Sequence, residues 1–141
     1  MTLPPKQNWT GKEPYLSCAL SNPNADLGDA KQVEVSGLIG TGATVVLIPI
    51  HVARELGLTK IDYATIQTAG SVHQGIVYDC RIMIQELAYV GEIRVCSIRG
   101  ATMNAGPNSD PTVTILLGRS LLRRFQLHFD GPANEFSLSL G

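Results

Sequence analysis

Residues 37–49, with the sequence GLIGTGATVVLIP, constrain the fold more than any other stretch of the chain. Two apolar segments flank a Gly-Thr-Gly turn, and a proline ends the second segment. A glycine on each side of Thr41 lets the backbone bend sharply and lets another segment approach closely. Burying such a turn is costly unless its backbone N–H and C=O groups find partners. The stretch therefore predicts two buried strands joined by a turn that forms a functional site, not merely a connecting loop.

Polar and apolar residues alternate with the period of a strand at 32–36, 75–84 and 136–140, and other short apolar segments are also typical of strands. Strands are predicted at 15–20, 32–36, 63–68, 75–84, 89–98, 112–118, 126–130 and 135–140. The segments 63–68 and 75–84 are expected to form a hairpin with its tip at 69–73. Only 49–57 and 119–125 are typical of short helices, the first with proline at its start and Gly57 just past its end. Many short strands with two short helices predict an all-β domain, either a closed barrel or a sandwich.

Length and charge bound the class of protein. With 141 residues the chain is long enough for one domain with a real core. Residues 1–14 are polar and contain prolines, so they are expected to form an extended arm before a domain at 15–141. A content of 44% hydrophobic and 16% charged residues suits a soluble globular chain. The net charge of -1 gives no field that would attract nucleic acid or an anionic membrane, so neither is an expected partner.

The cysteines and histidines do not indicate a disulfide framework or a metal site. Three cysteines, Cys18, Cys80 and Cys96, lie at wide spacings and are expected to be reduced, partly buried thiols. The three histidines, His51, His73 and His128, have no ligand spacing, so no metal or other cofactor is expected. The sequence has no signal peptide and no membrane-spanning segment, which favours a cytoplasmic location.

Three motifs occur in an order that resembles the retropepsin-like aspartic proteases. They are the GTGAT turn at 40–44, the hairpin with a tip of small residues at 69–73, and ILLGR at 115–119 before a helical turn. The resemblance runs from about residue 32 to residue 140. It implies a closed β-barrel or sandwich with a flap hairpin. It also implies a homodimer in which each chain supplies one aspartate to a site that hydrolyses an extended peptide, without a cofactor.

The same resemblance assigns roles to residues of this chain. The catalytic loop would be Gly40, Thr41 and Gly42, with the threonine hydroxyls of two chains bracing each other's loops. Substrate-binding positions would be Ala43, Thr44, Ala69, Gly70, Ser71, Val72 and His73. His73 is also read as a plain exposed histidine beside the flap tip. The strand end and helix start at Leu117, Gly118 and Arg119 would pass behind the catalytic turn.

The sequence departs from the family at the reacting position, because Gly40 stands where the family has its aspartate. Two aspartates within hydrogen-bond reach share a proton: the ionised one activates water and the protonated one donates to the oxyanion. Glycine does neither. The nearest acidic candidates, Asp29, Asp62, Asp79 and Asp130, are expected to be solvated carboxylates in turns or at strand edges.

Three interpretations of Gly40 stay open. The leading one is an aspartic endopeptidase silenced by an aspartate-to-glycine change, so that the chain as written is inactive. The alternative is a natural pseudoprotease that binds peptides or only dimerises, and the third is a misleading resemblance. Thr44 is a second departure, because retroviral members often have an acidic residue there that pairs with the arginine at position 119. Arg119 is therefore expected to face solvent, to cap carbonyl groups or to lie at a dimer edge.

Overall fold

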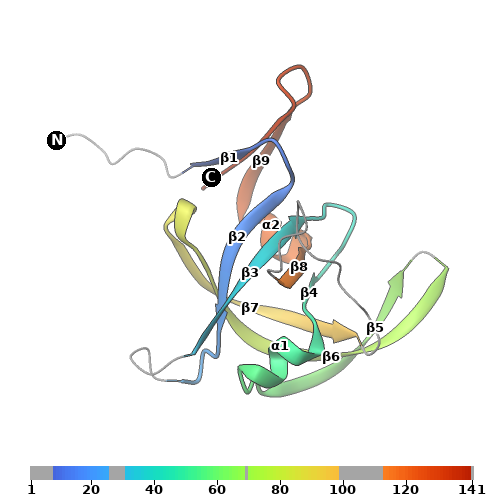
Figure 1. Cartoon of the computed structure of the whole chain (residues 1–141). Coiled ribbons are helices and arrows are strands. Elements are labelled where there is room, and N and C mark those ends of the chain that lie inside the picture. The colour runs from blue at the N-terminus through green and yellow to red at the C-terminus, as the bar shows by residue number, and fades with distance from the viewer. Residues whose placement is uncertain (1–7, 26–30, 69, 99–112, 141) are drawn as a thin grey trace.

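The computed structural model describes residues 8–25, 31–68, 70–98 and 113–140. Figure 1 shows the arrangement of their strands and helices. The strands are β1 (Asn8–Gly11), β2 (Tyr15–Ser21), β3 (Gln32–Ile39), β4 (Val46–Leu47), β5 (Lys60–Thr68), β6 (Ser71–Ile84), β7 (Tyr89–Ile98), β8 (Val113–Leu117), β9 (Phe125–Asp130) and β10 (Glu135–Leu140). The helices are α1 (Ile50–Glu55), the 3₁₀ helix η1 (Gln85–Leu87) and α2 (Arg119–Leu122). The prediction of an all-β domain with two short α-helices is confirmed.

Six strands close into a barrel. They are hydrogen-bonded in the order β2-β3-β8-β4-β7-β6, and β2 also pairs with β6, which completes the ring. Strand β5 lies outside the ring and pairs with β6, so that the two form a hairpin that extends from the barrel (Figure 1). A closed ring leaves no open edge among its own strands, which is how small β-domains avoid edge-to-edge association.

The interior of the barrel is filled by the apolar face that the alternation in β6 predicts. Cys80, Ile82 and Ile84 are fully buried, and Tyr78 is nearly so, whereas Asp79 on the other face is half-buried. These side chains belong to one core together with residues of β2, β8 and α2. Because side chains alternate across a strand, this pattern determines which face of β6 points inward.

Two apolar strands that end in glycine lie side by side. β3 and β8 are parallel, with Leu38 opposite Leu116 and Ile39 opposite Leu117. Leu116 is also paired with Leu47 of β4 on its other side. This pairing brings Gly40, which follows β3, next to the end of β8, and so it positions the turn at 40–44.

The N-terminal region contains a strand where the sequence predicts only an extended arm. Asn8–Gly11 forms β1, which pairs with β10, and Trp9 is buried in the core. Strand β10 lies between β1 and β9 in a separate three-stranded sheet. The apolar segment at 136–140 therefore finds its partner strands within the same chain. In this sheet, the strands with an unpaired edge among the described residues are β1 and β9. Residues 1–7 lie outside the described part.

The tip of the β5–β6 hairpin is shorter than the sequence predicts. Thr68 pairs with Ser71, and Gly70 adopts a left-handed φ of 85°, which glycine tolerates without strain. Ser71, Val72 and His73 therefore belong to β6 instead of a five-residue tip. The other tip residue, Ala69, lies outside the described residues.

The three thiols are free and buried, as expected from their spacing. Burial raises the pKa of Cys18 to about 12, with a smaller contribution from the negative charges of Glu34 and Glu86. Burial also raises the pKa of Cys80 to about 12, against a small lowering by a hydrogen bond to the Ser21 backbone. The neutral thiols are thus favoured in the folded protein.

We expect iodoacetamide at about pH 8 to leave Cys18 and Cys80 unmodified in the folded protein, because the reactive species is an accessible thiolate. The pKa values of the two thiols are higher in the folded protein than the ordinary value of 9.0. Their contribution to the free energy of unfolding is therefore fully present below pH 9.0 and is lost as the pH rises from 9.0 to about 12. Each thiol then lowers the free energy of unfolding by about 1.4 kcal/mol per pH unit in that window. Mass spectrometry of the alkylated protein, with a urea-unfolded sample as control, measures the protection. Rapid labelling of Cys18 in the folded sample would contradict it.

Candidate functional site

The turn at 40–44 satisfies its backbone groups through specific hydrogen bonds. The Gly40 N–H donates to the Leu117 carbonyl at 3.0 Å, and the Ala43 N–H donates to the Gly40 carbonyl at 3.1 Å. Thr41 and Gly42, at the outer part of the turn, are exposed. The turn is therefore anchored to β8 at its base while its tip faces solvent.

The end of β8 and the start of α2 pass directly behind this turn. The Arg119 N–H donates to the Ala43 carbonyl and the Ser120 N–H donates to the Thr44 carbonyl, both at 2.9 Å. Gly118 lies so close to Val45 that a Cβ at position 118 would be 2.1 Å from the Val45 carbonyl oxygen. A side chain is sterically impossible there without movement of the backbone. The glycine thus lets the two segments touch, which explains why Leu-Gly-Arg accompanies the turn.

The Arg119 side chain binds the turn even though position 44 is not acidic. Its guanidinium donates to the Thr41 carbonyl at 3.3 Å and to the Thr44 hydroxyl oxygen at 3.4 Å. This matches the carbonyl-capping interpretation of Arg119. Because the arginine is exposed, these bonds orient the turn more than they stabilise the fold.

A cleft of about 700 Å³ opens beside the turn. The turn and β4 form one wall, and β5 of the hairpin forms the other. The lining residues are Gly40, Gly42, Ala43, Thr44, Val45, Leu47, Thr65, Ile66, Gln67 and Leu116. The structure therefore brings together four of the positions that the sequence resemblance assigns to the site. The six others were missed, because their place in the cleft depends on how β4, β5 and β8 pack.

The Leu116 side chain packs against Gly40. A Cβ built on Gly40 would lie 2.5 Å from the Leu116 Cδ1 atom, whereas the nearest backbone atom, the Leu117 carbonyl oxygen, would be 3.8 Å away. Leu116 is half-buried, unlike its neighbours Ile115 and Leu117, which are fully buried. A side chain at position 40 therefore requires the flexible end of one leucine to rotate, but no shift of the backbone.

No carboxylate lines the cleft within the described residues. Asp79 faces Arg94 at 4.0 Å, and Asp130 accepts a hydrogen bond from the Ala133 N–H. Asp62 is exposed at the start of β5, and Asp29 lies outside the described residues. In the part of the chain that the structure describes, no group of three or more histidine, cysteine or acidic side chains is placed to hold a metal ion. Among the described residues, the cleft is therefore lined by apolar and uncharged polar side chains and by backbone.

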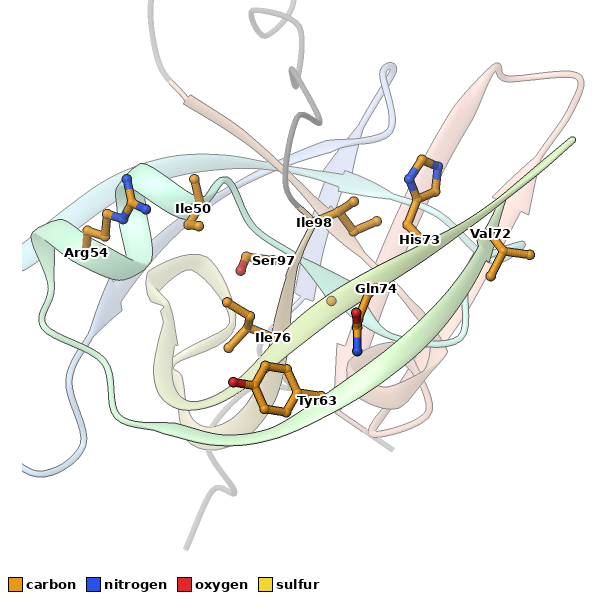
Figure 2. A pocket seen from close by; sticks show the side chains of 10 residues that line it. Ile50, Arg54, Tyr63, Val72, His73, Gln74, Ile76, Ser97 and Ile98 are labelled. Carbon is orange, nitrogen blue, oxygen red and sulfur yellow. The ribbon is translucent and has the colours of Figure 1, made fainter.

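None of the predicted flap positions among the described residues lines this cleft. Val72 and His73 line a different pocket, which lies between the hairpin, α1 and the end of β7 (Figure 2). Ser71 is exposed, and its hydroxyl is 2.9 Å from the His73 Nε2 atom. Instead it is Thr65, Ile66 and Gln67 of the opposite arm that border the cleft. Sequence spacing locates the hairpin but not the direction in which each arm faces.

Comparisons with known proteins identify the fold. No protein-family model matches the chain, and no curated protein matches it by sequence. A retropepsin-like aspartic protease from Rickettsia conorii superposes with a TM-score of 0.58 at 19% identity, over 93% of this chain and 98% of that chain. The retroviral protease-like domain of Ddi1 from Leishmania major gives a TM-score of 0.51 at 12% identity, over 91% of each chain. The chain has the retropepsin-like fold, as the three sequence motifs predicted.

No helix among the described residues is long and apolar enough to cross a membrane.

Proposed function

We propose that this chain is one half of a retropepsin-type aspartic endopeptidase whose reacting carboxylate is missing at Gly40. The observation that supports this most is the anchored turn beside a cleft of about 700 Å³, in a chain with the retropepsin-like fold. Two copies with aspartate at position 40 would share a proton and activate a water molecule. With glycine, the chain retains the cleft but has no general acid or base, so it is expected to be inactive.

In this proposal the cleft binds an extended peptide. An extended chain adds main-chain hydrogen bonds to an exposed strand, and pockets for its alternate side chains give selectivity. β5 supplies the strand along one wall, and Val45, Leu47 and Leu116 supply apolar surface beside Gly40. This composition favours substrates with an apolar residue next to the scissile bond.

A homodimer completes the proposed site. One chain offers one turn, and the exposed Thr41 and Gly42 leave the tip of that turn free to meet a second copy. Closed two-fold dimers place the same residues of both copies at the axis, as a shared site requires. A concentration series in sedimentation velocity tests this directly, and a monomer at high concentration would contradict it.

The second candidate function is peptide binding without cleavage, in which glycine is the native residue at position 40. It is favoured by the packing of Leu116 over Gly40, which fills the space that an aspartate would need. Restoring aspartate at position 40 distinguishes the two candidates. The endopeptidase proposal requires cleavage by that variant, whereas the binding proposal requires only saturable binding by the present chain.

We expect an extended peptide with an apolar centre to bind the present chain saturably in calorimetry. Ile66→Asp should weaken this binding at least about tenfold, because it places a charge in an apolar wall of the cleft. Val90→Asp is the matched control, since Val90 is 56% exposed on β7 and does not line the cleft. Equal affinities of the two variants would show that the peptide binds elsewhere, and absence of binding would count against both candidates.

A further inference from the structure

A second pocket, of about 600 Å³, lies between α1, the β5–β6 hairpin and the end of β7. Figure 2 shows Ile50 and Arg54 reaching it from the helix, His73 and Gln74 from the hairpin, and Ser97 and Ile76 between them. Its volume is in the range of pockets that bind small ligands, which is about 300–1,000 Å³. Within the described part of the chain, none of its lining residues belongs to the cleft beside Gly40.

The inner surface of this pocket contains apolar side chains from several elements. Ile50, Ile76 and Ile98 supply aliphatic surface from three different elements. Ser97 is only 1% exposed, and its hydroxyl already donates to the Tyr78 hydroxyl oxygen at 3.3 Å. A ligand that enters the pocket therefore contacts apolar side chains and a serine whose hydroxyl already donates a hydrogen bond to Tyr78. This favours an apolar body for the ligand.

The rim of the pocket carries the positive charge of Arg54. Among the described residues, no aspartate or glutamate lines the pocket. The Arg54 guanidinium has no hydrogen bond or ion pair with any described residue, and the adjacent Glu55 pairs with Lys31 at 3.0 Å. An arginine side chain is always charged and binds carboxylates in a two-pronged geometry. The rim thus presents a cation that is free to bind an anionic group.

Apolar side chains are also exposed at this rim. Tyr63 is 56% exposed and Val72 is 66% exposed, although both line the pocket. The ammonium group of Lys60 lies 3.9 Å from the centre of the Tyr63 ring and binds its hydroxyl, which adds a further cation close to the pocket. The nearby Asp62 accepts a hydrogen bond from the Tyr63 N–H and does not line the pocket. Exposed apolar side chains that are grouped together mark sites of interaction. Beside the charge of Arg54, they suit a ligand that has both an apolar body and an anionic group.

We propose that this pocket binds a monocarboxylate with an apolar body, with the carboxylate on Arg54 and the body against Ile50, Ile76 and Ile98. A free carboxylic acid and the C-terminus of a peptide that ends in an aliphatic residue share this chemistry. Binding here does not depend on the proposed protease function, because the pocket shares no lining residue with the cleft.

Octanoate is the probe that tests this site. We expect millimolar affinity, because a ligand of this size gains only a modest binding free energy from its few atoms. Octanamide and octylamine keep the apolar body but remove or reverse the charge, and both should bind at least about tenfold more weakly. The methyl signals of Ile50, Ile76 and Ile98 in NMR spectra should shift on titration. Shifts confined to other residues, or equal binding of the three probes, would overturn the proposal.

Matched variants separate this site from non-specific attraction. Arg54→Gln should lower octanoate affinity about tenfold, as expected for the loss of a charge-assisted hydrogen bond. Arg123→Gln is the control, because Arg123 is an exposed arginine at the end of α2 that does not line the pocket. An equal loss in both variants would overturn the proposal.

Two peptides that differ only at the C-terminus distinguish the sources of the carboxylate. One ends in leucine with a free carboxylate, and the other ends in leucine amide. Tighter binding of the free-carboxylate peptide than of octanoate supports the site and identifies a chain terminus as its ligand. Tighter binding of octanoate supports the site and identifies a free acid. Failure of both carboxylates to bind at millimolar concentration overturns the proposal.

Discussion

Replacing Gly40 with aspartate is expected to give a protein that cleaves extended peptides at acidic pH, whereas the present chain is expected to cleave none. The reason is that two carboxylates brought together cannot both ionise, so the pair holds one proton and works as acid and base at once. Cleavage should exceed uncatalysed hydrolysis by roughly 10⁶-fold or more, the usual lower range for enzymes. A library of unstructured peptides read by mass spectrometry measures it, and a statine-type transition-state mimic should block it.

The control for this prediction is Gly40→Asn, which has nearly the same size but no carboxylate, and it should remain inactive. Both variants displace the Leu116 side chain, because a Cβ at position 40 would be 2.5 Å from its Cδ1 atom. Combining Gly40→Asp with Leu116→Ala supplies the space if the leucine does not rotate away. If both aspartate variants are folded and dimeric yet cleave nothing, the endopeptidase proposal is wrong.

Gly118→Ala is expected to destabilise the fold by about 3 kcal/mol or more, the upper range for forcing atoms into a packed interior. The added Cβ would lie 2.1 Å from the carbonyl oxygen of Val45, 2.6 Å from its carbonyl carbon and 2.8 Å from its nitrogen. These are backbone atoms of the segment that follows the turn, so rotating a side chain does not relieve the clash. Urea unfolding followed by circular dichroism measures the loss.

Gly42→Ala is the matched control for that prediction. It lies in the same turn region, but a Cβ there meets no atom within 4 Å, and its φ is not in the left-handed region. We expect it to change the free energy of unfolding by less than about 1 kcal/mol. Equal losses in the two variants would show that close approach to Val45 is not what requires glycine at position 118.

The fold could be predicted from the sequence because its signals are local or depend on order along the chain. The alternation in β6 predicted the buried face, and Gly57, which has a left-handed φ of 62°, correctly marked the end of α1. These two features follow from residue type and spacing. The resemblance carried by the GTGAT turn and the ILLGR segment implied a strand passing behind the turn, and the parallel pairing of β3 with β8 is the structural counterpart.

Other features depended on pairing between distant segments. The N-terminal residues that look like an arm contain β1, because Trp9 finds a buried position beside β10. Val72 and His73 look like flap residues in sequence, but the strand register assigns them to β6 and to the pocket beside α1. Local composition does not contain this information, since a shift of one residue in register exchanges the two faces of a strand.

The sequence by itself predicted that residues 37–49 form strand, turn and strand, and it places glycine, without a carboxylate, at position 40 of that turn. Only the tertiary structure decided what surrounds that glycine: the Leu117 carbonyl that holds its N–H, the Leu116 side chain that covers it, and the wall of β5 across the cleft. The physical reason is that the residue type at position 40 can be read from that position alone. The space around it is made by segments far apart in the chain, whose approach is set by packing of the whole barrel.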